Sequence, residues 1–136
     1  MCGIFGYVGK REEEVAVKAY FALRDLEYRG YDSWGIAAPM KDELKLLRAV
    51  GKISEKSESD FSGIVGKMSI GHSRWATHGG VLEKNAHPQL SRDKRIAVIH
   101  NGIIENHHEL RRFLVEETGI PESELFLSDT DTEVIP

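Results

Sequence analysis

Cysteine is nearly absent from this sequence, since Cys2 is the only one among 136 residues. A disulfide framework is therefore excluded, and the composition fits a reducing compartment, for which we expect the cytoplasm. The sequence also lacks the run of about 18 apolar residues that a membrane-spanning helix needs, so we expect no membrane partner. No charged segment followed by an apolar stretch opens the chain, and we expect no secretory signal.

An excess of positive charge is also missing. The 18 lysines and arginines are outnumbered by 22 aspartates and glutamates, the formal net charge is −4, and the basic residues are scattered. Nucleic-acid-binding domains carry clustered basic residues, so we expect no nucleic-acid partner. With 40% apolar and 29% charged residues, the chain has the composition of one globular domain with a core of its own.

Zinc-binding motifs are missing too, although six histidines are present. These are His72, His78, His87, His100, His107 and His108. No pair of them has the spacing of a zinc motif, and the only cysteine lies at the extreme terminus, so we expect no metal site. His107 and His108 fit the exposed first turn of a helix. His72 and His100 end predicted strands and are expected to be structural histidines with satisfied hydrogen bonds.

The sequence does contain a pattern of short strands interrupted by helices. Apolar and β-branched residues predict strands at 4–8, 35–38, 44–50, 68–73, 96–100 and 125–127. Apolar residues spaced by three or four predict a helix over 12–28. Residues 52–67 predict one short helix and a loop, and residues 130–133 resemble the opening of another helix. This order of elements indicates an α+β or layered α/β domain.

Another helix is predicted to begin at Asn106 and to end at Gly119. Asn106 is a typical N-cap residue, and Glu109 three residues later would complete a capping box. Three apolar residues supply the predicted buried stripe of this helix, namely Leu110, Phe113 and Leu114.

Cys2 follows the initiator methionine directly, in the run Met1-Cys2-Gly3. Methionine is normally trimmed before a small residue, so the mature chain is expected to begin with a thiol and a free α-amine on one residue. An α-amine has a pKa of about 7.7–8.0, so part of it is an unprotonated base at neutral pH. Such an amine can activate the nucleophile beside it without a separate histidine. The alternative is that Cys2 is a small buried apolar residue.

Six short blocks occur in a fixed order along the chain. They are Cys-Gly-Ile at 2–4, Leu-Glu-Tyr-Arg-Gly-Tyr-Asp-Ser at 26–33, Gly-His-Ser-Arg-Trp-Ala-Thr-His-Gly at 71–79, Asn-Ala-His-Pro at 85–88, His-Asn-Gly-Ile-Ile-Glu-Asn at 100–106 and Ser-Asp-Thr-Asp-Thr-Glu at 128–133. Together they resemble the glutaminase domain of class II (N-terminal nucleophile) glutamine amidotransferases. Within that family they are most similar to the glucosamine-forming branch, the glutamine–fructose-6-phosphate aminotransferases.

The resemblance implies an α+β fold, a four-layer α-β-β-α sandwich of two antiparallel sheets. It implies that residues 1–136 form a glutaminase domain that is incomplete at its C-terminal end, with the sugar-isomerase domains absent. The implied substrate is L-glutamine, and the ammonia goes to a synthase or sugar-isomerase domain or subunit. The implied glutaminase site uses no metal or organic cofactor. Exposed sheet edges would be covered by other chains, such as further copies in a homo-oligomer.

The resemblance also assigns catalytic roles. Cys2 would attack the side-chain amide of glutamine, with its own amine as general base and acid. Asn101 and Gly102 would form the oxyanion hole from a side-chain amide and a backbone N–H. Taken alone, the same Asn-Gly pair would be interpreted as a turn. Arg29, in the loop expected near Cys2, would orient the terminus.

The remaining assignments concern the grip on the amino-acid end of glutamine. By resemblance, Arg74 holds the α-carboxylate through a bidentate fork, helped by Thr77 and His78. Asp131 pairs with the α-ammonium, and Trp75 forms a wall of the pocket. Outside the motifs, an arginine after a strand is usually a solvated charge, Trp75 would be assigned to the core, and Asp131 to the first turn of a helix.

One residue departs from the family pattern. Trp34 occupies a position where a small residue such as alanine is expected, and overpacking of a core costs about 1–3 kcal/mol unless neighbours compensate. Three alternatives to the main interpretation stay open. The chain could be the glutaminase domain of another class II amidotransferase, a non-catalytic glutamine-binding module, or a fragment without function.

Overall fold

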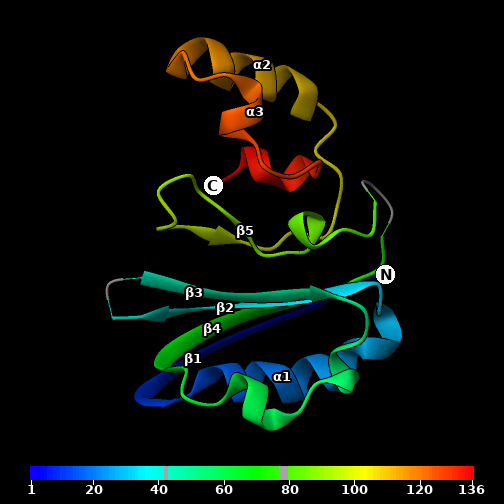
Figure 1. The fold of residues 1–136 in the computed structure, drawn as a ribbon, viewed down its shortest axis with the longest axis vertical. Helices are drawn as coiled ribbons and strands as arrows, with labels where there is room; N and C mark the ends of the chain where they lie inside the picture. Colours follow the sequence, from blue (N-terminus) through cyan, green and yellow to red (C-terminus); the bar gives the residue numbers. More distant parts are fainter. Residues whose placement is uncertain (42, 77–79) are drawn as a thin grey trace.

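A four-stranded antiparallel sheet lies at the centre of the computed structural model, which describes residues 1–41, 43–76 and 80–136 (Figure 1). Its strands are β1 (Gly3–Glu14), β2 (Ser33–Met40), β3 (Glu43–Val50) and β4 (Val65–Arg74), in the spatial order β1-β4-β2-β3. β4 is therefore an interior strand. Gly3 lies opposite Ser73 on one side of it, and Ser33 lies opposite Arg74 on the other.

Helix α1 (Val15–Leu26) covers one face of this sheet (Figure 1). Its buried residues are Val15, Ala16, Ala19, Tyr20 and Leu23, spaced as an amphipathic helix requires. Two 3-10 turns, Ile53–Glu55 and Glu58–Phe61, lie against α1, and the ring of Phe61 stacks on Tyr20 with the centroids 4.6 Å apart. The hydrophobic core lies between the helix and the sheet.

Trp34 belongs to this core. It is 5% exposed, and its ring centroid lies 5.4 Å from that of Phe61. The large side chain therefore finds room between β2 and the 3-10 turn that carries Phe61. Its indole Nε1 has no hydrogen-bond partner among the described residues.

The second half of the chain lies over the other face of the sheet. β5 (Gln89–Leu90) and β6 (Ala97–Val98) form a two-stranded antiparallel sheet, and α2 (His107–Thr118) and α3 (Glu122–Leu125) lie beyond it (Figure 1). The layers thus follow the predicted order of helix, sheet, sheet and helix. Three further 3-10 turns are Glu27–Arg29, Glu83–Asn85 and Asp131–Val134. None of the helices in the described ranges is long and apolar enough to cross a bilayer.

Several predicted elements are confirmed with shifted ends. The strands predicted at 35–38, 44–50 and 68–73 are β2, β3 and β4, and the helix predicted over 12–28 is α1 with a 3-10 turn after it. The strand predicted at 96–100 is reduced to β6, and β5 was not predicted. The helix opening predicted at 130–133 is the 3-10 turn Asp131–Val134.

The strand predicted at 125–127 is wrong. Leu125 ends α3, Phe126 is buried under the guanidinium of Arg111, and Leu127 is exposed. The backbone N–H groups of Leu127 and Ser128 donate to the carboxylate of Glu133 at 2.7 Å each. Because a side chain takes these donors, they are not available to a neighbouring strand.

The helix predicted from Asn106 to Gly119 is confirmed as α2, with Asn106 at the N-cap position and a left-handed φ of 66° at Gly119. The predicted capping box and buried stripe are wrong. The Asn106 side chain makes no cap hydrogen bond, no residue of α2 is buried, and Phe113 is 54% exposed. The helix is fixed instead by Arg111, whose Nη2 donates to the carbonyl oxygens of Ser128 and Thr130 at 3.0 Å each.

Gly30 lies close to the backbone at the end of β4, so a larger residue there tests how tightly this region is packed. A Cβ on Gly30 would lie 2.6 Å from both the Arg74 carbonyl carbon and the Trp75 nitrogen, which are backbone atoms that cannot rotate away. We expect Gly30→Ala to lower the free energy of unfolding by about 1–3 kcal/mol, as overpacking does.

Gly6→Ala is the matched control, because a Cβ there meets nothing within 4 Å. Its effect should stay within about 0.5 kcal/mol. Urea denaturation of both variants checks the difference, and equal unfolding midpoints would contradict the packing argument.

Candidate active site

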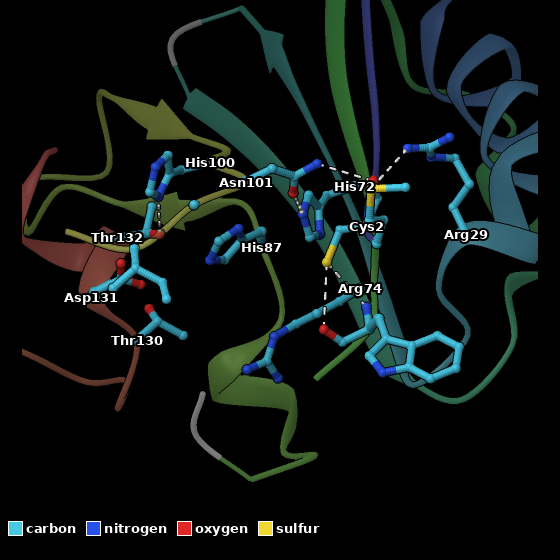
Figure 2. Close-up of a pocket in the computed structure, with 14 residues that line it drawn as sticks. Cys2, Arg29, His72, Arg74, His87, His100, Asn101, Thr130, Asp131 and Thr132 are labelled. Carbon is cyan, nitrogen blue, oxygen red and sulfur yellow. Dashed lines mark hydrogen bonds between the residues drawn. The ribbon is translucent and has the colours of Figure 1, made fainter. Parts of the chain in front are cut away.

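A cavity of about 370 Å³ opens between the two halves of the chain (Figure 2). Its lining comes from the N-terminus, the end of β4, the loop before β5, the segment between β6 and α2, and the last 3-10 turn. The lining residues are Met1, Cys2, Arg29, His72, Arg74, Trp75, His87, His100, Asn101, Gly102, Ile103, Thr130, Asp131 and Thr132. Every predicted site residue within the described ranges is among them. Thr77 and His78 lie outside those ranges.

Cys2 lies at the edge of the cavity because β1 starts beside the end of β4. The backbone N–H of Trp75 donates to the Cys2 sulfur at 3.2 Å, and the sulfur lies 3.5 Å from the Trp75 carbonyl oxygen. The turn after β4 is held by Asp32, which accepts the Ala76 N–H at 2.8 Å and donates its own N–H to the Arg74 carbonyl at 3.0 Å.

Asn101 contacts both the nucleophile residue and the sheet. Its Nδ2 donates to the Cys2 carbonyl oxygen at 3.0 Å, and its Oδ1 lies 2.9 Å from the Nε2 of His72. Gly102 follows at a close approach, since a Cβ there would lie 2.6 Å from the His100 Nε2. The Asn101 side-chain amide therefore lies beside Cys2, and Gly102 lines the same cavity.

Arg74 and Asp131 bring opposite charges to the same cavity. Arg74 is 5% exposed, and its Nη1 donates to the Gly80 carbonyl at 3.4 Å. Burial lowers the pKa of Arg74, and the negative charges of Asp32 and Asp131 partly offset this. The Oδ2 of Asp131 accepts the Ile104 N–H at 2.7 Å, and the Oδ1 takes no part in that hydrogen bond. A guanidinium and a carboxylate in one cavity fit the two charged groups of a free amino acid.

Trp75 and Arg29 also line the cavity. Trp75 is 43% exposed and packs edge-on against Tyr31, with the centroids 5.4 Å apart. The Arg29 Nη2 lies 3.9 Å from the Met1 sulfur, so this side chain reaches the N-terminal residue. Trp75 is therefore in the wall of the cavity and Arg29 is beside the terminal residue.

His87, Thr130 and Thr132 also line the cavity, and no role is predicted for them from the sequence. All three belong to blocks that carry the family resemblance, and their place in those blocks could have identified them as cavity residues. The expectation of satisfied hydrogen bonds is wrong for His72, whose buried Nδ1 has no partner among the described residues, and the Nδ1 of His87 has none either. His100 Nδ1 lies 3.3 Å from the Thr132 hydroxyl. Within the described residues, no group of three or more His, Cys, Asp or Glu side chains could hold a metal.

Comparison with known proteins agrees with this arrangement. A family model described as a glutamine amidotransferase domain matches residues 34–136. The chain belongs to the glutamine amidotransferase family. The matched region includes the strand of Arg74 and the segments of Asn101 and Asp131, while Cys2 and Arg29 precede it.

Relatives within the glutamine amidotransferase family are named glutamine–fructose-6-phosphate aminotransferase (isomerizing). The chain is 52% identical to the one from Shewanella oneidensis over 99% of its length, 48% identical to the one from Thermus thermophilus over 99%, and 46% identical to the one from Methanococcus maripaludis over 100%. The chain covers 21%, 21% and 22% of these relatives, respectively. It therefore spans about a fifth of the length of the curated relatives it matches.

Two solved structures have the same fold over 98% of the chain. One is the glutamine phosphoribosylpyrophosphate amidotransferase of B. subtilis complexed with ADP and GMP, with a TM-score of 0.73 and 30% identity. The other is described as the allosteric regulatory enzyme of purine biosynthesis, with a TM-score of 0.78 and 33% identity. The chain covers 28% of each. The N-terminal nucleophile fold of the amidotransferases is thus the fold of this chain.

The two buried histidines of the cavity, His72 and His87, predict that the folded state loses stability in acid. Burial lowers the pKa of His72 from 6.5 to about 4 and that of His87 from 6.5 to about 3. Below pH 6.5 the unfolded chain binds protons that the native chain does not. The contribution of these histidines to the unfolding free energy is therefore full above pH 6.5 and is lost as the pH is lowered. From pH 7 to pH 5 each histidine should cost about 2 kcal/mol of unfolding free energy.

His87→Gln removes one of these two groups and should reduce the loss between pH 7 and pH 5 by roughly half. His108→Gln, on the exposed side of α2, is the control and should keep the wild-type loss. Urea denaturation across this pH range is the measurement. An unchanged pH dependence in His87→Gln would show that His87 is not a buried neutral histidine.

Proposed function

We propose that this chain hydrolyses L-glutamine to glutamate and ammonia through a thioester on Cys2. The observation that supports this most directly is the meeting of the Cys2 thiol, the Asn101 amide and the Arg74 guanidinium in one cavity of about 370 Å³. A nucleophile, an oxyanion donor and a carboxylate binder are the groups that amide hydrolysis on a free amino acid requires.

The proposed reaction starts from a chain trimmed of Met1, so that thiol and α-amine share one residue. The amine takes the Sγ–H proton, and sulfur attacks the side-chain amide carbon of glutamine, whose oxygen becomes an anion. When this intermediate collapses, the C–N bond breaks, the amine gives its proton to the departing nitrogen, and ammonia leaves a glutamyl thioester. Water then loses a proton to the amine and attacks the thioester. The C–S bond breaks, sulfur regains the proton, and glutamate is released.

Asn101 and Gly102 would stabilise the anionic oxygen. An amide NH₂ has two donors, and the Cys2 carbonyl uses only one Asn101 N–H at 3.0 Å. The second N–H of Asn101, with the backbone N–H of Gly102, would bind the oxyanion. Loss of one such donor typically costs about 10²–10³ in rate.

Arg74 and Asp131 would hold the α-carboxylate and α-ammonium of glutamine. Charged hydrogen bonds at both ends of the amino acid would orient its side-chain amide toward Cys2. Trp75 would form a wall of the pocket, Thr77 and His78 would assist Arg74, and Arg29 would orient the terminus.

The ammonia would convert fructose 6-phosphate to glucosamine 6-phosphate. This rests on the names of relatives at 46–52% identity, which exceeds the 30–33% identity to the two solved amidotransferase structures. A sugar-isomerase domain or subunit would be the partner that receives the ammonia, in the cytoplasm, and further copies of the chain could cover exposed sheet edges. The second candidate, ammonia transfer to phosphoribosylpyrophosphate, is favoured only by the fold, and analysis of the product formed with each acceptor separates the two.

Cys2→Ala should abolish glutamine hydrolysis, with a loss of about 10⁴-fold or more, because no other thiol is present. Glutamine binding, measured by calorimetry, should remain. In the wild type, intact mass should show loss of Met1 and one adduct from an electrophilic glutamine analogue, prevented by excess glutamine. Turnover of Cys2→Ala near the wild-type rate would exclude Cys2 as the nucleophile.

Arg74→Lys should raise KM for glutamine by about 10-fold or more, because an ammonium cannot reproduce the bidentate fork. Arg112→Lys, on the exposed side of α2, makes the same chemical change away from the cavity and should leave KM unaltered. Steady-state kinetics measures both. A normal KM in Arg74→Lys would remove Arg74 from the carboxylate site.

A further inference from the structure

A short chain of hydrogen bonds joins the central sheet to the N-terminal residue. His72 Nε2 lies 2.9 Å from Asn101 Oδ1, and Asn101 Nδ2 lies 3.0 Å from the Cys2 carbonyl oxygen (Figure 2). Asn101 is on an irregular segment between β6 and α2, whereas His72 belongs to β4. The proposed oxyanion donor, Asn101, is thus a loop residue that is hydrogen-bonded to a strand residue, His72.

The chemistry of the partners fixes which way the Asn101 amide faces. A backbone carbonyl only accepts hydrogen bonds, so the Asn101 atom facing Cys2 must be the nitrogen. The Asn101 oxygen then faces His72, and because that oxygen only accepts, His72 must carry its proton on Nε2. This leaves the Nδ1 of His72 as a bare acceptor, in agreement with the absence of a partner for it among the described residues.

His72 is held rigidly enough to serve as this donor. It is 1% exposed and lies in the interior strand β4, opposite Ile4 of β1 and Gly35 of β2. Its ring packs on that of His87, with the centroids 4.7 Å apart. Burial also lowers the pKa of His72 to about 4, so the ring is neutral at physiological pH and one nitrogen carries the only N–H.

We propose that His72 is a positioning residue for glutamine hydrolysis: its Nε2–H holds the Asn101 side chain so that the free N–H of the Asn101 amide is directed at the oxyanion. The proposal rests on the proposed function and adds a residue that acts through Asn101. A rotated Asn101 amide would present its oxygen to the developing negative charge, so the hydrogen bond from His72 acts on the transition state.

The test compares two substitutions at His72 in the purified natural protein. His72→Gln keeps an N–H that can reach Asn101 Oδ1, whereas His72→Leu removes it. His72→Leu should lower kcat by about 10–100-fold, since the donor is misdirected rather than deleted. KM for glutamine should stay within about twofold, because the Arg74 and Asp131 grip is intact. His72→Gln should recover most of kcat.

A double-mutant cycle with Asn101→Ala separates positioning from simple core filling. If His72 acts through Asn101, His72→Leu should have no further effect on kcat in the Asn101→Ala background. Independent, multiplicative losses in the two variants, or failure of His72→Gln to recover kcat, would overturn the proposal.

The hydrogen bond between His72 and Asn101 can also be measured without an activity assay. ¹⁵N NMR of the His72 ring should show the Nε2–H tautomer in the wild type and a mixture of tautomers in Asn101→Ala, and this measurement stands even if His72→Leu fails to fold. An Nδ1–H tautomer in the wild type would overturn the proposal. Absence of hydrolysis in the wild type, with the Nε2–H tautomer present, would instead contradict the proposed function.

Discussion

The pairing of β1 with β4 is the interaction on which the site depends. Gly3 lies opposite Ser73, so Cys2 and Arg74 meet where these two strands end. Cys2 is the proposed nucleophile and Arg74 the proposed carboxylate binder. A strand register is fixed by many hydrogen bonds and by the burial of one face, so a slip of one residue would separate the two groups.

The part of the cavity next to β4 is lined by buried polar side chains, and the sheet stabilises this combination. Arg74 and His72 project from the same face of β4, two residues apart, and both lose hydration there. The guanidinium keeps its charge because hydrogen-bond acceptors and carboxylates surround it, whereas the histidine becomes neutral. One strand therefore supplies a fixed cation and a fixed neutral donor to neighbouring parts of the cavity.

The strands were predictable because they follow from short-range patterns: runs of apolar and β-branched residues predicted β2 to β4. The gathering of Cys2, Arg74, Asn101 and Asp131 was implied by the family resemblance that the six blocks carry. The region after β6 was predicted poorly because distant side chains satisfy its backbone. Glu133 takes the N–H groups of 127 and 128, and Arg111 fixes α2 without an apolar stripe. Periodicity carries no signal for such bonds.

The Arg111 contacts join the outermost helix to the segment that carries Asp131. Arg111 binds the carbonyl groups of Ser128 and Thr130, immediately before Asp131, and no residue of α2 is buried. Loss of the Arg111 side chain would therefore release both the helix and the segment that carries Asp131, so a residue outside the cavity helps to shape the wall of the cavity.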